Sequence, residues 1–195
     1  MTLFIVGLVL FLGIHSVGIV APAWREAQVA QRGELAWKSL YSVVAVLGFV
    51  LLVYGYGLAR QSSPVLYAPP TVLRHIALLL MVPVFPLLLA AYLPGRIQSA
   101  VKHPMLAAVK LWATAHLLAS GTLVDVILFG AFLAWAVLDR IAIKRRAVPR
   151  AAPGAPRSAA NDVIALVGGL AVYGAFVMWV HLRLIGVSPL ASALR

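Results

Sequence analysis

Six long apolar runs constrain this chain more than any other feature of its sequence. They cover roughly residues 3–21, 40–58, 72–93, 105–119, 122–138 and 162–182. A helix that crosses a bilayer needs about 20 apolar residues, within a range of about 17–25. The 195-residue chain is 63% hydrophobic and 11% charged, whereas soluble domains are about 45–50% apolar and about 25% charged. The sequence therefore predicts an all-α protein, a single polytopic transmembrane helical bundle of about six spans.

Turn and breaker residues predict where these helices end or bend. Between the fourth and fifth runs, "ASGT" predicts a tight turn in which Gly121 takes a left-handed cap and Thr122 opens the next helix. Pro83 and Pro86 predict a bend in the third span, which lipid tolerates when neighbours satisfy the freed carbonyls. The segment 144–161 is rich in Pro, Ala and Arg and predicts a flexible basic linker.

The basic residues predict the orientation of the bundle. With six spans, twelve of the sixteen Lys and Arg residues follow spans one, three and five: Arg25, Arg32, Lys38, Arg96, Lys102, Lys110, Arg140, Lys144, Arg145, Arg146, Arg150 and Arg157. The positive-inside rule then places these loops in the cytoplasm and both termini on the non-cytoplasmic side. The net charge of +11 has the same origin, because such loops face anionic membrane lipid. No basic patch alternates with aromatic residues, which argues against nucleic-acid binding.

The chain has five histidines, and two of them lie deep inside apolar runs. His75 and His181 lie near the outer ends of their runs, where an imidazole suits the headgroup layer, and His103 precedes a proline at the inner start of the fourth run. At a rise of about 1.5 Å per residue, His15 and His116 lie roughly 9 Å and 16 Å from the inner ends of their spans. An ionisable group at such a depth faces the bundle interior and is paired or functional.

Two interpretations of His15 and His116 are open. Each could make one hydrogen bond that joins two helices, for which Ser16 and Thr114 lie nearby. Alternatively, the two imidazoles could bind a common ligand, and the spacing of the sequence does not decide between these roles.

The rest of the chain restricts what a common ligand could be. There is no cysteine, and the five acidic residues lie in loops or at helix ends: Glu26, Glu34, Asp125, Asp139 and Asp162. Zinc and di-iron sites need three or four protein donors, and a proton relay needs buried acids. A haem supplies four nitrogens itself and requires only one or two axial ligands. We therefore expect His15 and His116 to be the metal ligands of a haem.

Residues around the two histidines suit such a cofactor. Small residues leave room beside each imidazole: Gly13, Gly18, Ala113 and Ala115. The porphyrin edge is expected to pack on Trp112 and Phe11. The propionates are expected to bind cations at the inner boundary of the membrane, and the candidates are Arg25, Lys38, Lys102 and Lys110.

Four segments of the chain resemble the NnrU family of bacterial membrane proteins. They are "FLGIHSVGIVAPAWR" at 11–25, "GYGLAR" at 55–60, "LPGRI" at 93–97 and "KHPMLAAVKLWATAHLLASG" at 102–121. The resemblance covers at least residues 1 to 146. Its specific elements are the HS, HP and W-x-x-x-H motifs in that order and spacing. A related family is the plant and cyanobacterial 15-cis-zeta-carotene isomerase, an integral membrane haem b enzyme.

The resemblance implies roles for three histidines. The HS and AH elements of the isomerase hold its haem ligands and match His15 and His116, and its HP element, needed for activity, matches His103, which is therefore the candidate catalytic residue. The resemblance also implies an isomerase-like or oxidoreductase-like protein of the bacterial inner membrane, linked to nitrite and nitric oxide metabolism in denitrification. It further implies a small apolar or polyene substrate and a redox partner.

The chain departs from these relatives at positions that bear on mechanism. The plant isomerase has a cysteine, implicated in a redox ligand switch, where this chain has Ala113. A Cys/His exchange at iron therefore cannot operate here. NnrU relatives often carry Arg at the position of Gly18 and Asn at that of Ser120, and the former change removes a propionate anchor from the first helix.

Two alternatives remain beside the haem protein. The first is a non-catalytic membrane accessory protein or permease, in which the histidines serve helix packing alone. The second is a membrane S-adenosylmethionine-dependent methyltransferase, because the HP element at His103 also resembles the Arg-His-Pro sequence of isoprenylcysteine methyltransferases. Lys102 replaces that arginine here, and the downstream carboxylates and asparagines of such a site are missing.

Overall fold

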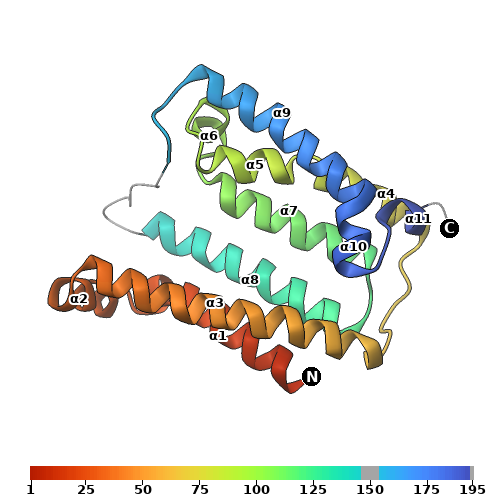
Figure 1. Ribbon diagram of the computed structural model, residues 1–195, viewed down its shortest axis with the longest axis horizontal. Coiled ribbons are helices and arrows are strands. Elements are labelled where there is room, and N and C mark those ends of the chain that lie inside the picture. Colours follow the sequence, from red (N-terminus) through yellow and green to blue (C-terminus); the bar gives the residue numbers. More distant parts are fainter. Residues whose placement is uncertain (146–153, 194–195) are drawn as a thin grey trace. The chain divides into compact units, whose positions relative to one another are not determined.

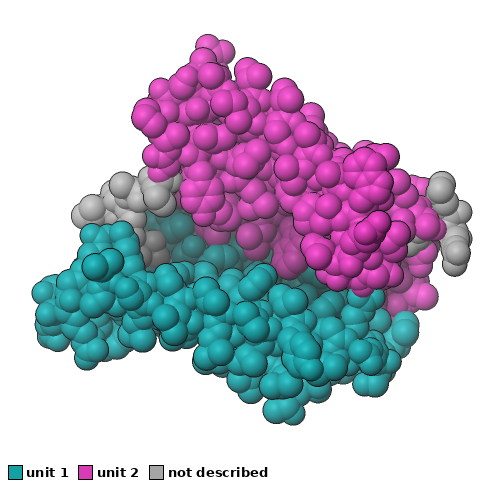
Figure 2. All heavy atoms as spheres, in the orientation of Figure 1, with its two compact units in different colours: residues 1–66, 122–146 teal, residues 67–121, 147–195 magenta. Residues whose placement is uncertain are grey.

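The computed structural model describes residues 1–145 and 154–193, and within these ranges the fold is helical with no β-strand. Among the described residues, five segments are long and apolar enough to cross a membrane: Thr2–Val20, Glu34–Ser62, Thr71–Ala90, Leu123–Arg145 and Ala159–Ile185. A shorter apolar helix, Pro104–Ala119, corresponds to the fourth predicted run, 105–119. The all-α membrane fold is thus confirmed. The chain forms two compact units, residues 1–66 with 122–146 and residues 67–121 with 147–195 (Figures 1 and 2).

Large apolar side chains remain exposed along the long helices. In α3 (Glu34–Ala59), Val46, Phe49 and Val53 are each more than half exposed. Water would make such a surface costly, whereas the hydrocarbon of a bilayer solvates it. Together with the length of the helices, this exposure identifies a multi-pass membrane protein.

The first unit is built on close contact between α1 (Thr2–Val20) and α3, with α8 (Leu123–Arg145) beside α1. Glycines make the α1–α3 contact possible. A Cβ on Gly7 would meet the backbone of Leu52, and one on Gly55 would meet the backbone of Phe4. Gly48 of α3 packs on the backbone of α1 in the same way. Small residues at helix contacts are the usual means by which membrane helices approach closely.

A hydrogen-bonded group closes one end of this unit, where α3 passes through the short helix η1 (Arg60–Ser62). Asp125 is only 5% exposed. Its carboxylate accepts from the Thr122 hydroxyl and from the Tyr56 hydroxyl, both at 2.6 Å, and the Ser63 hydroxyl accepts from the Val124 N–H at 3.0 Å. The Asp125 amide donates to the Thr122 hydroxyl at 3.4 Å, so Thr122 precedes and caps α8 as predicted.

The left-handed cap predicted for Gly121 is wrong. Within the described residues, the glycines with positive φ are Gly33 and Gly186. Gly121 instead packs against the carbonyl of Tyr67, whose amide donates back to the Gly121 carbonyl at 3.3 Å. The Tyr67 hydroxyl also donates to carbonyls at the end of the preceding helix. Glycine is required at position 121 because the backbone of Tyr67 lies too close for a Cβ, and not because of a left-handed turn.

An amphipathic helix that the sequence analysis did not predict, α2 (Pro22–Arg32), connects α1 to α3. Proline stands in its first turn, where the missing N–H costs nothing. Trp24 meets the ring of Trp37 edge-on at 5.8 Å, and the Arg25 guanidinium lies 5.9 Å from the Trp37 ring. Tryptophan and arginine together at the ends of two spans are typical of a membrane–water interface.

The second unit surrounds a core at the crossing of α5 (Val84–Ala90) and α7 (Pro104–Ala119). Val84, Leu87 and Ala108 are its buried centre. Helix α4 (Thr71–Met81) packs on α7, and α9 (Ala159–Ala175) packs on α5. The helix of α9 continues through the π-helical turn η2 (Phe176–Val180) into α10 (His181–Ile185), and α11 (Pro189–Ala193) follows.

The bend predicted from Pro83 is confirmed, and its freed carbonyl is satisfied. Helix α4 ends at Met81 and α5 begins at Val84. The Val82 amide donates to Leu79 instead of Leu78, so the Leu78 carbonyl loses its helical partner. The Tyr173 hydroxyl from α9 donates to that carbonyl at 2.8 Å. A neighbouring helix thus supplies the hydrogen bond that lipid cannot.

The linker predicted over 144–161 is shorter at both ends. Lys144 and Arg145 belong to α8, Ser158 caps α9, and residues 146–153 lie outside the described residues. Asp162, in the first turn of α9, connects this helix to α6 (Arg96–Val101). Its carboxylate accepts from the Arg96 and Ile97 amides at 2.8 and 3.0 Å. A carboxylate suits these N–H groups because the helix start carries unpaired donors.

Candidate functional site

His15 lies in the first unit, five residues before the end of α1, in an aromatic environment. Its Nδ1 is 2.7 Å from the Phe11 carbonyl, one helical turn earlier. The Phe11 ring lies 4.3 Å from the imidazole, the Tyr41 ring 5.2 Å and the Trp135 ring 6.0 Å, all between centroids. No acidic side chain belongs to this set of rings.

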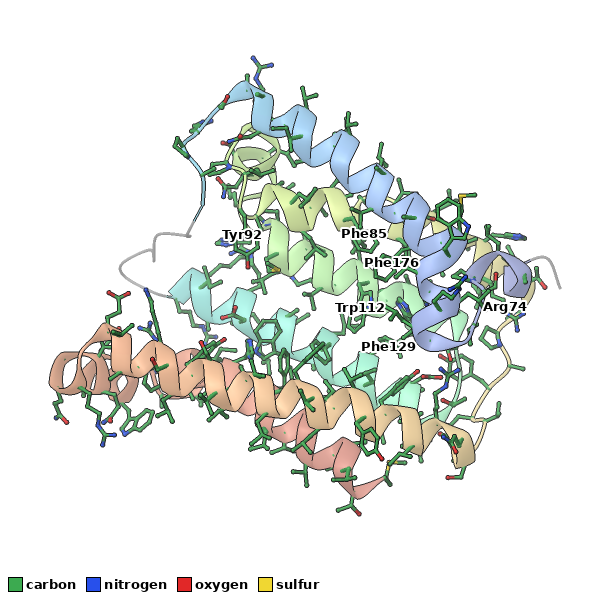
Figure 3. The ribbon with its side chains drawn as sticks, in the orientation of Figure 1. Arg74, Phe85, Tyr92, Trp112, Phe129 and Phe176 are labelled. Atoms are coloured by element: carbon green, nitrogen blue, oxygen red, sulfur yellow. The ribbon has the colours of Figure 1, made fainter. Side chains whose placement is uncertain are left out.

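His116 repeats the same local geometry in the second unit. Its Nδ1 is 2.8 Å from the Trp112 carbonyl, again one turn earlier, and the Trp112 ring lies 5.3 Å from the imidazole (Trp112 is labelled in Figure 3). Ala113 and Ala115 beside it are buried, with exposures of 0% and 1%. Small side chains therefore do flank this histidine, as predicted.

The backbone contact determines which imidazole nitrogen can bind a metal. A carbonyl oxygen only accepts hydrogen bonds, so in each neutral ring Nδ1 carries the proton and donates it. The lone pair then resides on Nε2, the state in which imidazole binds a metal ion. Metal-binding histidines commonly donate their second nitrogen to a backbone carbonyl in this way.

In both histidines Nδ1 bonds the backbone of its own helix, so Nδ1 does not make the hydrogen bond between two helices that the packing interpretation expected. The Nδ1 bonds of His15 and His116 lie within their own helices, and the Ser16 hydroxyl donates to the Leu12 carbonyl of α1 at 2.6 Å. Ser16 is therefore not the partner that joins His15 to a second helix. Because His15 and His116 belong to different units, a shared iron between them stays a prediction.

One buried donor beside His15 has no acceptor. Within the described part of the chain, the indole Nε1 of Trp135 is buried and makes no hydrogen bond. The Trp135 ring is nearly perpendicular to His15, at 87°. Trp135 lies near the middle of α8, far from the interface where tryptophan usually anchors. An unsatisfied donor at that depth is suited to an acceptor from outside the protein, such as a water molecule, an ion or a ligand.

His103 and Lys102 lie at the opposite end of α7 from His116. His103 is the residue before the helix, and thirteen residues at about 1.5 Å each separate it from His116 by roughly 20 Å. Lys102 has a φ of 65°, a conformation that residues other than glycine seldom adopt. The structure therefore does not bring the predicted catalytic residue to the imidazole of His116.

The predicted propionate partners divide between the units. In the first unit, Lys38 pairs with Glu34 at 2.8 Å, and Arg25 lies over Trp37. In the second unit, Lys102 is the C-cap of α6, two residues before α7 begins at Pro104, and Lys110 lies within α7, six residues before His116. The two cations of the first unit thus have protein partners in addition to any ligand.

No group of three or more His, Cys, Asp or Glu residues forms a metal site within residues 1–145 and 154–193. A metal bound by His15 or His116 needs further donors from elsewhere. A macrocycle with four nitrogens provides them, so the donor chemistry fits the predicted cofactor.

Two features were missed by the sequence analysis. His181, assigned to the headgroup layer, lies 6.4 Å from His116 between ring centroids, with 25° between the ring planes. Trp135 was not considered, although a tryptophan in the middle of a span is unusual enough to be a signal. The π-helical turn before His181 leaves no comparable signal in the sequence.

Comparison with known proteins adds one finding to this geometry. Residues 3–189, nearly the whole chain, match the family described as "NnrU protein". No curated protein and no solved structure matches the chain.

Proposed function

The chain belongs to the NnrU family, and from this premise we propose that it is a haem b-binding protein of the bacterial inner membrane. His15 and His116 would hold the haem iron. The observation that supports the proposal is the Nδ1–carbonyl bond of each ring, at 2.7 and 2.8 Å, which puts the ring proton on Nδ1 and makes Nε2 the nitrogen that would bind iron.

The protein's own groups would bind and orient the cofactor. Trp112 beside His116 and Phe11 beside His15 offer apolar faces, and cations bind the propionates: Arg25, Lys38, Lys102 and Lys110. Bound haem supplies one-electron chemistry at iron. Aromatic rings surround His15, and the buried Trp135 N–H would be a hydrogen-bond donor to a group bound there.

The proposed reaction class is based on the resemblance to the NnrU and carotene isomerase families. We propose a redox-dependent, isomerase-like or oxidoreductase-like role linked to nitrite and nitric oxide metabolism, with an apolar substrate such as a polyene and a separate redox partner. His103 retains its proposed catalytic role, acting at the start of α7, about 20 Å along the helix from His116.

An absorption spectrum tests the haem assignment. The protein is purified in mild detergent with a tag free of histidine, and its reduced-minus-oxidised spectrum is recorded. The wild type is expected to show the bands of low-spin haem b. His15→Ala and His116→Ala are expected to lose haem or to become five-coordinate, and added imidazole is expected to restore the six-coordinate spectrum. His75→Ala, an exposed histidine of α4, is the matched control.

The outcomes separate the alternatives. An unchanged Soret band in both ligand variants overturns the assignment. If the wild type binds no chromophore and the variants lose only thermal stability, the accessory or permease interpretation holds. Binding of S-adenosylmethionine that His103→Ala abolishes would support the methyltransferase.

A further inference from the structure

Two imidazoles from different helices meet inside the second unit. His116 on α7 and His181 at the start of α10 lie 6.4 Å apart between ring centroids. Both belong to the same unit, so this pair is independent of where the first unit lies. His181 is half-buried, and it was not part of the haem site predicted from the sequence.

Each ring of this pair has Nδ1 held by a backbone carbonyl. His116 Nδ1 donates to Trp112 at 2.8 Å, and His181 Nδ1 donates to the Val187 carbonyl at 2.7 Å. The Val187 carbonyl reaches His181 because the chain reverses at Gly186, whose φ of 77° suits glycine. Both neutral rings therefore carry the lone pair on Nε2, the metal-binding nitrogen.

A π-helical turn places His181. The five residues Phe176–Val180, directly before it, form a π-helix between α9 and α10 (both labelled in Figure 1). The wider turn changes the direction in which every later side chain leaves the helix. Such turns are energetically poor and occur frequently at functional sites, so its position next to His181 is a second indication of a site. Phe176 anchors the turn on Phe85 of α5, with ring centroids 5.0 Å apart (Figure 3).

We propose that His116 and His181 form a two-imidazole site for a divalent transition-metal ion of the Cu²⁺, Ni²⁺ or Zn²⁺ class. These ions bond an imidazole nitrogen at about 2.0–2.1 Å. A tetrahedral ion such as Zn²⁺ would hold two ring centres about 5 Å apart, whereas two rings in trans positions on a square-planar Cu²⁺ or Ni²⁺ have their centres about 6 Å apart. The observed 6.4 Å matches the second spacing. Imidazole is the preferred nitrogen ligand of this class. Water or a small anion completes the coordination shell.

The site shares one residue with the proposed haem site. A single Nε2 lone pair serves one metal at a time, so an ion at His116 and His181 excludes haem from His116. The ion site itself needs no haem. Its test therefore succeeds or fails independently of the proposed function.

Calorimetric titration of haem-free protein with Cu²⁺, Ni²⁺ and Zn²⁺ tests the proposal. We expect one ion per chain, with Cu²⁺ bound most tightly. Loss of a second-shell partner costs about 10–100-fold in metal affinity, so His116→Ala and His181→Ala are each expected to weaken binding at least about tenfold. His75→Ala is expected to bind like the wild type. A tag without histidine is essential.

Replacing one metal ligand by another distinguishes loss of the metal site from misfolding of the variant. His181→Cys replaces the imidazole by a thiolate ligand, and we expect it to bind Zn²⁺ where His181→Ala does not. Wild-type affinity in His181→Ala would overturn the proposal, as would equal loss in His75→Ala. If haem binds, haem-loaded protein is expected to lose the ion site, and simultaneous full binding of both would also contradict it.

Discussion

At the scale of single residues, the polar groups of this membrane protein find partners in nearby backbone. His15, Ser16 and His116 each bond the carbonyl one helical turn earlier. The bond removes the cost of a bare polar group in hydrocarbon and fixes the side chain at the same time. In a histidine it also selects the tautomer. The exception is Trp135, whose buried N–H has no acceptor within the described ranges.

Trp135→Phe distinguishes a ligand donor from a packing residue. The substitution keeps an aromatic ring and removes an N–H that has no acceptor among residues 1–145 and 154–193, so the free energy of unfolding is expected to change by less than about 1 kcal/mol. If the indole donates to bound haem, haem affinity is expected to fall about two- to tenfold, since one hydrogen bond contributes about 0.5–1.5 kcal/mol. A haem titration followed at the Soret band measures this. Trp179→Phe, at an exposed position of η2, is the control.

Tyr173→Phe tests the repair of the helix break at Pro83. It leaves the Leu78 carbonyl without the hydroxyl that now bonds it at 2.8 Å. The loss is expected to destabilise the protein by about 0.6–1.7 kcal/mol, the range of interhelical hydrogen bonds in bilayers. Thermal unfolding in detergent, compared with Tyr54→Phe on an exposed surface of α3, measures the difference. Equal stability of the two variants would refute this role of Tyr173.

The sequence identified some of these residues and could not identify others. His15 and His116 stand out because an imidazole deep in an apolar run is costly, which is a property of the local sequence. The pairing of His116 with His181 depends on a π-helical turn and on the reversal at Gly186. Those features arise from packing between segments about 65 residues apart in the chain, so no local pattern reports them.

At the scale of helices, apolar length predicted the segments well and their ends less well. The run predicted at 40–58 belongs to a helix that begins at Glu34. Its first turns contain polar residues that suit the headgroup layer, and a search for apolar runs does not include them. The missed helix α2 has low overall hydrophobicity and separates its polar and apolar residues around the helix. That pattern marks an interfacial helix, and a search for apolar runs overlooks it.

Two glycines of α3 give a matched test of helix contact. Gly55 touches the backbone of α1 at Phe4, whereas Gly57, two residues later, has no atom within 4 Å of an added Cβ. Gly55→Ala is expected to destabilise the α1–α3 contact by about 1–3 kcal/mol, because backbone cannot move aside. Gly57→Ala is expected to be neutral or to stabilise by up to about 1 kcal/mol. Unfolding in a denaturing detergent series ranks the variants, and similar behaviour of the two would contradict the glycine contact.

At the scale of the whole molecule, topology depends on the shortest apolar helix. Helix α7 has 16 residues, which at about 1.5 Å each span about 24 Å against about 30 Å of hydrocarbon. A short span is accommodated when the bilayer thins locally or flanking residues extend toward the interface. Lys102, two residues before α7, and Ser120, the C-cap of α7, suit that arrangement. We therefore expect α7 to cross, which makes six spans and places both termini outside.

Single cysteines report this topology directly, because the native chain contains none. Gln31→Cys follows the first span, Gln61→Cys follows the second, and Ser188→Cys follows the last. In intact spheroplasts, a membrane-impermeant maleimide is expected to label the cysteines at 61 and 188, and the cysteine at 31 only after permeabilisation. The unmodified chain is the background control. Protection at 188 with labelling at 61 would mean that α7 enters and returns, and labelling at 31 alone would mean an inverted bundle, against the positive-inside rule.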